Sequence, residues 1–135
     1  MATQRKYLYR VLRDDENYRE GIEAEDPDAD KTVENHVEYG SYRTSQFIST
    51  CATLEAARTF ASKSRNPPKT IVRINVEKLK KENVEIIDLT IKSVLDKHIS
   101  AKRTTARFYA TKDKEILIKG SIPPSCVKFE EYFPN

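Results

Sequence analysis

Glycine is scarce in this 135-residue chain, which contains only Gly21, Gly40 and Gly120. Gly-rich phosphate-binding loops need several glycines at fixed spacing, and neither GxGxxG nor GxxxxGK[ST] occurs here. A nucleotide that binds this chain must therefore be held by other groups.

Cysteine and histidine are also few: Cys51, Cys126, His36 and His98. Two cysteines are too few for a disulfide scaffold, and no metal-ligand spacing is present, so we expect no metal site. A single bridge is one alternative, and a reduced intracellular pair is the default. One cysteine with one histidine is a weak indication of a catalytic thiol, because free cysteine is often simply buried.

Long apolar runs are missing as well. No stretch approaches the roughly 20 apolar residues of a membrane span, and the first ten residues contain no apolar run typical of a signal peptide. We expect no membrane partner and a cytoplasmic or nuclear location, with secretion by another route left open. A net charge of +3 permits a polyanionic partner without requiring one. The length predicts one domain, residues 1–135.

Hydrophobic periodicity predicts an α+β fold. Amphipathic helices are expected at 31–40, capped by Asp30, and at 54–63, capped by Thr53. Residues 77–83 fit a turn or short helix, 91–101 a weak helix, and 104–113 are ambiguous. Strands are predicted at 6–13, around 47–48, and at 69–76, 84–90, 114–120 and 126–133. Helices early and strands late favour α+β over an alternating parallel sheet.

Four polar features stand out, and each has an ordinary interpretation when taken alone. Arg10 lies among apolar strand residues, which is typical of a paired structural arginine; its functional alternative is a fork on a pyrophosphate. His36 lies on the apolar face of its helix, as core histidines do. Ser49 and Thr50 end a strand, and Glu115 fits an exposed strand residue.

In order, these features resemble the ADP-ribosyltransferase fold, in its arginine–serine–glutamate branch. That branch includes the cholera toxin A chain, heat-labile enterotoxin and pierisin-like enzymes. The matching motifs are an aromatic–Arg pair, an apolar–Ser–Thr step into a helix, and an acid–x–Glu motif before an apolar strand and a Gly/Ile/Pro turn. They correspond to Tyr9-Arg10, Phe47–Cys51, Asp113–Glu115 and 116–123.

The resemblance implies two small packed antiparallel or mixed β-sheets, with flanking helices around an NAD cleft. It also implies an NAD-dependent mono-ADP-ribosyltransferase that cleaves the nicotinamide–ribose bond. The acceptor would be a protein side chain, a nucleic-acid base or water. NAD would be the co-substrate, without a metal, and we expect a monomer. Glu115, Ser49 and Arg10 would be the catalytic residues.

Further residue roles follow from the same resemblance. NAD would be bound by Tyr9, Arg10, His36, Ser49 and Thr50, and the acceptor by Asp113, Arg107 and Tyr109. Two positions depart from the family pattern. Asp113 stands where a longer Glu or Gln is usual, and Cys51 stands where serine is usual. These departures support the alternative, an inactive module of the same fold that binds nucleotide, nucleic acid or a protein partner.

Overall fold

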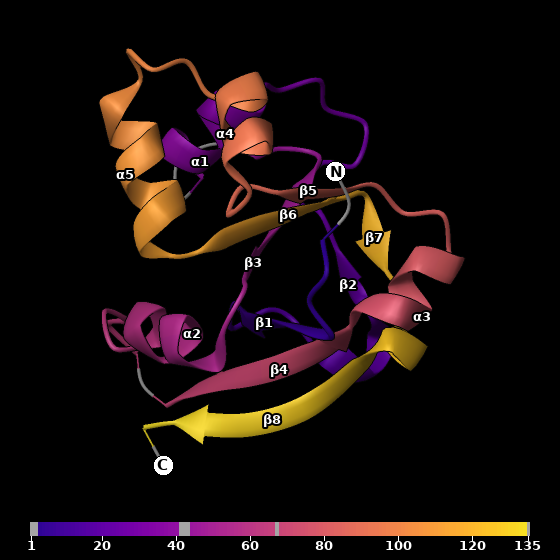
Figure 1. The fold of residues 1–135 in the computed structure, drawn as a ribbon. Coiled ribbons are helices and arrows are strands. Elements are labelled where there is room, and N and C mark those ends of the chain that lie inside the picture. Colours follow the sequence, from indigo (N-terminus) through magenta and orange to yellow (C-terminus); the bar gives the residue numbers. More distant parts are fainter. Residues whose placement is uncertain (1–2, 41–43, 67, 135) are drawn as a thin grey trace.

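The computed structural model describes residues 3–40, 44–66 and 68–134 of the chain. Its fold is α+β, with a six-stranded antiparallel sheet in the order β5-β6-β3-β1-β4-β8 and a two-stranded β2–β7 sheet (Figure 1). The strands are β1 Tyr7–Val11, β2 Ile22–Glu23, β3 Phe47–Cys51, β4 Lys69–Asn75, β5 Ile86–Asp88, β6 Glu115–Lys119, β7 Ser121–Ile122 and β8 Val127–Phe133.

The large sheet consists of two three-stranded halves, β5-β6-β3 and β1-β4-β8. One registered pair, Tyr9 with Cys51, joins them, whereas β3 and β6 pair along their whole length. Figure 1 shows β3 turned steeply against β1 at this junction. The two main sheets expected from the sequence are therefore halves of one sheet, because the Tyr9–Cys51 pair keeps them hydrogen-bonded.

Helices pack on both halves (Figure 1). Helices α1, α4 and α5 share an apolar cluster with β3, β5 and β6, and α2 packs on β1 and β3. The helices are α1 Val33–Tyr39, α2 Leu54–Ala61, α3 Val76–Lys81, α4 Lys92–His98 and α5 Thr104–Lys112. None of the helices within the described residues is long and apolar enough to cross a membrane.

Side-chain caps fix where the first two helices begin. Thr53 caps α2 by accepting a hydrogen bond from the Ala56 backbone N–H, as expected. For α1 the expected cap, Asp30, is wrong. Thr32 accepts from the Asn35 N–H at 3.1 Å, because a cap must directly precede the first helical residue, here Val33.

Three helices, α3 to α5, lie in the second half of the chain, so the expected early clustering of helices is wrong. The ambiguous residues 104–113 form α5 almost entirely. This helix buries Ala106 and Ala110, four residues apart, and leaves Phe108 and Tyr109 exposed. Small buried alanines beside exposed aromatic rings blur the apolar periodicity on which sequence prediction depends.

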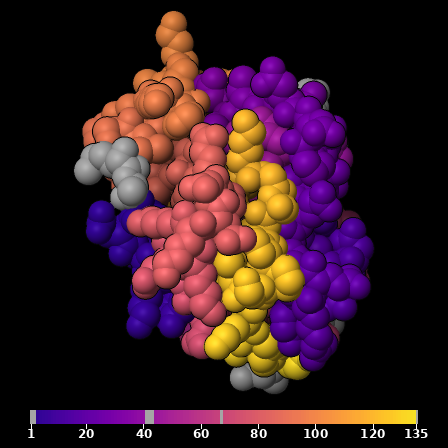
Figure 2. All heavy atoms as spheres, turned by 90° about the vertical axis from the view of Figure 1, so that its right-hand side faces the viewer, coloured from indigo at the N-terminus to yellow at the C-terminus, as the bar shows by residue number. Residues whose placement is uncertain are grey.

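The N-terminal and C-terminal parts of the chain meet on one side of the molecule. Figure 2 shows the C-terminal residues, in yellow, on the surface between α3 and the N-terminal segment. There the short helical turns Tyr18–Glu20 and Pro124–Cys126 contact each other, and each also contacts β8. This packing closes the core beside the β2–β7 sheet.

Candidate active site

Glu115 is the first residue of β6, and it lies opposite Cys51 of β3. It follows the end of α5 directly, since Asp113 caps that helix and Lys114 adopts a left-handed φ of 48°. This tight turn places a carboxyl group on an interior strand, where only 7% of the residue is exposed. The exposed position that fits Glu115 when it is taken alone is therefore wrong, although the residue does lie at the end of its strand.

The environment of Glu115 favours its protonated form. Burial, with the nearby Asp113 carboxylate, raises its pKa to about 8, while a hydrogen bond from Ser49 and the charge of Arg10 lower it to a smaller extent. At neutral pH most molecules therefore hold a neutral Glu115. A buried carboxyl group with such a pKa is typical of functional sites, although structural networks also produce it.

Arg10 is buried and links three segments of the chain. Its Nη1 donates to the backbone oxygen of Ser49 at 2.7 Å, and its Nη2 donates to both carboxylate oxygens of Glu16 at 3.0 and 3.1 Å. Among the described side chains, its Nε is the one buried polar atom without a partner. The guanidinium is thus already occupied by Glu16, which also accepts from the Arg13 backbone N–H at 2.8 Å.

Both imidazole nitrogens of His36 contact serine hydroxyl groups. Its Nδ1 lies 2.5 Å from Ser45 Oγ, and its Nε2 lies 2.7 Å from Ser49 Oγ. Burial and the charge of Arg10 lower its pKa to about 4, so the imidazole is neutral at physiological pH. His36 therefore orients Ser49, a role that sequence reasoning did not assign. Ser45 was missed altogether, because its contact depends on the fold.

Thr50 and Tyr9, also expected to bind NAD, have structural contacts. Thr50 is buried, and its Oγ1 donates to the backbone oxygen of Ile116 at 2.6 Å, which ties β3 to β6. Tyr9 packs against the apolar cluster of α2, and burial raises its pKa, as does the nearby Glu130. Both residues hold together the strands that carry Arg10 and Glu115.

The three residues expected to bind an acceptor divide into two places. Tyr109 and Asp113 lie at the end of α5 that leads to Glu115, and Lys112 lies 5.8 Å from the Tyr109 ring centre. Burial raises the pKa of Asp113, whereas the charges of Lys112 and Lys63 lower it. Arg107 instead donates to Asp96 at 2.8 Å and to the Ile99 backbone oxygen at 2.6 Å, fastening α5 to the end of α4.

Cys51 is a poor nucleophile in this setting. Burial and the nearby carboxyl groups of Glu115 and Asp113 raise its pKa to about 12, so almost no thiolate exists at neutral pH. Cys51 and Cys126 are both free thiols, and no disulfide joins them. Within the described residues, no three His, Cys, Asp or Glu side chains gather as a metal site would require.

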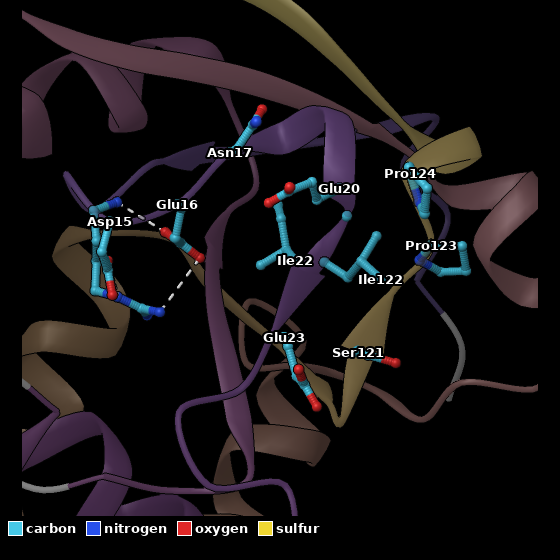
Figure 3. A pocket seen from close by; sticks show the side chains of 12 residues that line it. Asp15, Glu16, Asn17, Glu20, Ile22, Glu23, Ser121, Ile122, Pro123 and Pro124 are labelled. Carbon is cyan, nitrogen blue, oxygen red and sulfur yellow. Dashed lines mark hydrogen bonds and ion pairs between the residues drawn. The ribbon is translucent and has the colours of Figure 1, made fainter.

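A cavity of about 520 Å³ lies beside the β2–β7 sheet (Figure 3). Figure 3 shows Ile22 and Ile122 facing each other there, with Glu20 and Glu23 alongside. Its charged lining residues are Arg13, Asp15, Glu16, Glu20 and Glu23. Excess negative charge makes this cavity unsuited to a pyrophosphate. None of the residues expected to form a site lines this cavity.

Glu16 connects the cavity to the polar cluster, because it both lines the cavity and pairs with Arg10. A second, smaller cavity of about 50 Å³ lies near Tyr7 and Lys128. Neither cavity is lined by Ser49 or Glu115. Ser49 and Glu115 therefore lie outside both of these cavities, whereas Glu16 belongs to the first cavity and to the polar cluster.

A known structure has a similar fold. The chain titled "EcPltA" aligns with a TM-score of 0.54 and 16% identity, over 97% of this chain and 86% of that chain. At this identity the likeness concerns the fold alone. No curated protein matches the sequence. The family model described as a domain of unknown function, DUF7587, matches residues 3–133, and the chain therefore belongs to that family.

Proposed function

We propose that this protein has an ADP-ribosyltransferase-like fold and cleaves the nicotinamide–ribose bond of NAD, transferring ADP-ribose to a macromolecule or to water. The observation that carries the proposal is the network around Ser49. Its hydroxyl contacts His36, its backbone oxygen accepts from Arg10, and Glu115 is its diagonal neighbour on the paired strand β6. Segments far apart in the sequence thus converge on one buried carboxyl group.

The reaction needs an ionised carboxylate near the ribose. As the bond between ribose C1′ and the nicotinamide nitrogen breaks, its electron pair moves to the nicotinamide ring, and the ribose gains oxocarbenium character. Glu115 would accept a hydrogen bond from a ribose hydroxyl and oppose this positive charge. The acceptor then bonds to C1′ and releases its proton to solvent. Because its pKa is about 8, Glu115 must first lose its own proton.

In this proposal Arg10 orders the backbone around Ser49 and does not bind NAD directly. It connects β1 to the Ser49 backbone, and its remaining contacts are with Glu16. Direct binding of a pyrophosphate by this guanidinium would require Glu16 to move away, since both Glu16 oxygens contact the same nitrogen. We therefore assign Arg10 to ordering the strand that carries Ser49, with His36 holding the Ser49 hydroxyl.

The acceptor would approach the end of α5 beside Glu115. Tyr109 offers an exposed aromatic ring, and Lys63 and Lys112 lie close to each other and to Asp113. An aromatic surface beside cations suits either a nucleic-acid base or a protein side chain. Arg107 enters only indirectly, by holding α5 against α4.

The test is nicotinamide release from labelled NAD, measured alone and with DNA, RNA or a protein extract, together with transfer of the label. The Glu115→Gln variant should release nicotinamide at least ~100-fold more slowly, because a preorganised electrostatic group is lost. The matched control is Glu23→Gln, a carboxylate of the cavity, which should leave the rate unchanged. Release that survives Glu115→Gln would refute the site.

A second candidate is a binding module without turnover. It is favoured by the occupied Arg10, by the neutral state of Glu115 at physiological pH, and by the short Asp113 side chain. In that case calorimetry would detect binding of NAD or a nucleic acid, with no nicotinamide released under any acceptor condition. Measurable release by the purified chain would exclude this alternative.

A further inference from the structure

A row of hydrogen bonds runs from Ser45 to Glu115. Ser45 precedes β3 and is buried, and its Oγ accepts from the Phe47 backbone N–H at 3.2 Å. The same oxygen lies 2.5 Å from His36 Nδ1, and His36 Nε2 lies 2.7 Å from Ser49 Oγ. Ser49 and Glu115 are diagonal neighbours on the paired strands β3 and β6, and the Ser49 hydroxyl lowers the Glu115 pKa as a hydrogen-bond donor does. Four side chains thus form one continuous line.

We propose that Ser45, His36 and Ser49 form one directional hydrogen-bond chain that positions the Glu115 carboxyl group, and that the chain reverses, with a change of the His36 tautomer, when Glu115 gains or loses its proton. Ser45 and His36 are then positioning residues, acting through Ser49. The catalytic consequence rests on the proposed NAD cleavage, whereas the chain itself is a property of the free protein.

With Glu115 ionised, the direction of every bond is determined. A carboxylate only accepts, so the Ser49 hydroxyl donates to it. Ser49 Oγ then accepts from His36 Nε2–H, which leaves Nδ1 as the acceptor of the neutral ring. The Ser45 hydroxyl donates to Nδ1, and Ser45 Oγ accepts from the Phe47 N–H. Each donor and acceptor in the row has a partner.

With Glu115 protonated, the row can run the other way. The carboxyl O–H donates to Ser49 Oγ, the Ser49 hydroxyl donates to His36 Nε2, and Nδ1–H donates to Ser45 Oγ. One proton separates the two states, and it is lost from Glu115 to solvent. The imidazole carries one proton in both states, at Nδ1 when Glu115 is neutral and at Nε2 when it is charged.

The two directions are unequal because of Ser45. In the reversed chain its oxygen accepts two hydrogen bonds, from Phe47 and His36. Its own hydroxyl hydrogen then has no acceptor among the side-chain contacts of the described residues. A buried hydroxyl without an acceptor is unfavourable. Ser45 therefore favours the direction that leaves Glu115 ionised, which is the form that the proposed reaction needs.

The surrounding charges leave the imidazole neutral in both states. Arg10 of β1 faces both His36 and Glu115, and Asp113 from the end of α5 faces Glu115. The Cys51 thiol of β3, which has its pKa raised to about 12, stays uncharged. Because the His36 pKa is lowered to about 4, a change at this ring near pH 8 reports a tautomer rather than protonation.

The test is long-range ¹H–¹⁵N NMR of the histidine rings in the full chain without NAD, from pH 6 to 10. We expect the protonated and unprotonated nitrogen signals of His36 to exchange places with a midpoint near pH 8. The carboxyl ¹³C signal of Glu115 should titrate with the same midpoint. A His98→Gln variant assigns the signals, since the chain has only these two histidines.

Two variants test the direction of the chain. In Glu115→Gln the His36 tautomer should stay constant across the pH range, because no proton is exchanged. In Ser45→Ala the midpoint should rise by at least about half a pH unit, since a hydrogen bond that favours the ionised form is lost. Ser62→Ala, an exposed serine outside the row, is the matched control and should keep the wild-type midpoint.

Several outcomes would overturn the proposal. They are a constant His36 tautomer while Glu115 titrates, an imidazolium signal near pH 7, or a midpoint that Ser45→Ala leaves unchanged in a variant whose backbone spectrum shows it to be folded. Failure of the proposed function has a different signature. The tautomer change would then be present, but nicotinamide release would be absent under every acceptor condition.

Discussion

Two regions of this molecule, a buried polar cluster and an acidic surface cavity, stand out for different reasons. The polar cluster of Arg10, His36, Ser49 and Glu115 is packed within the fold, and neither described cavity is lined by Ser49 or Glu115. The acidic cavity beside β2 and β7 encloses about 520 Å³, and most of its charged side chains reach solvent. The first region has converging polar side chains outside these two cavities, and the second is a cavity without such converging side chains.

This contrast indicates that the burial of ionisable groups, rather than a surface hollow, is the property that points to function in this protein. A surface hollow needs no special explanation, since three of its four carboxylates, those of Asp15, Glu20 and Glu23, remain solvated. A buried carboxyl group with a pKa near 8 and a buried guanidinium oppose folding unless their surroundings compensate. Burying the polar cluster therefore opposes folding more strongly than forming the acidic cavity does, and the following predictions test that contrast.

The largest effect is expected from Arg10→Met. Removing the guanidinium leaves Glu16, whose side chain is 7% exposed, without its main partner, so the free energy of unfolding should fall by about 3–5 kcal/mol. The control is Arg13→Met. The Arg13 side chain lies at the cavity and is 37% exposed in its ion pairs, so its removal should change the free energy of unfolding by less than about 1 kcal/mol. Urea unfolding measures both.

A double variant separates charge from packing. If the unpaired Glu16 carboxylate causes the loss, Arg10→Met combined with Glu16→Met should recover part of the stability, because no buried charge then remains at this place. An Arg10→Met variant no less stable than Arg13→Met would show that the buried pair contributes nothing beyond an exposed one. The contrast between the two regions would then be lost.

The second effect is the pH dependence of nicotinamide release. Only ionised Glu115 is competent in the proposed reaction, and its pKa is about 8, so kcat/KM should rise with pH and level off above pH 8. Between pH 6 and 9 the increase should be on the order of 100-fold. Glu23→Gln in the cavity should give the same profile. A flat profile for the wild-type protein would contradict the assignment of Glu115.

Much of the fold was predictable because strands and capped helices leave local signals. Thr53 and the alternation of β1 are examples. Other features depend on tertiary packing. Helix α5 buries only two alanines, so its pattern was ambiguous, and the β2–β7 pair involves two short strands about a hundred residues apart, whose pairing no local pattern marks.

The candidate site was predictable only as a set of residue types. Arg10, Ser49 and Glu115 do converge, but their partners could not be predicted. Glu16 lies between the predicted strand 6–13 and the predicted helix 31–40, and Ser45 is one of many serines. The burial of Glu115 was missed, because a Lys-rich approach to the strand is typical of an exposed position, whereas β6 lies between β5 and β3.

The third effect concerns stability in the Glu115→Gln variant. The folded pKa of about 8 lies above the ordinary 4.5, so the wild-type protein loses stability as the pH rises through this window. Glutamine carries no proton to lose. From pH 5 to pH 8, the free energy of unfolding of the variant should therefore rise relative to that of the wild type by at least about 2 kcal/mol. Urea unfolding at several pH values measures the difference.

The titration of His36 changes stability in the opposite direction, and it does not affect the comparison of Glu115→Gln with the wild type. Its folded pKa of about 4 lies below the ordinary 6.5, so stability is lost as the pH falls from 6.5 toward 4. Both proteins keep His36, and the effect cancels in their difference. A stability difference that does not change with pH would mean that Glu115 is ionised already at low pH.

The smallest effect is expected at the cavity. Glu20→Gln or Glu23→Gln removes one of the four carboxylates that line it, and both residues are exposed. Less mutual repulsion should raise the free energy of unfolding by no more than about 0.5 kcal/mol. The gain should shrink in high salt, because exposed charges are screened there. Thermal unfolding at low and high salt measures it. A loss of more than about 1 kcal/mol in either variant would show that these carboxylates hold the fold together, and that the cavity, like the polar cluster, is built from interactions the protein needs.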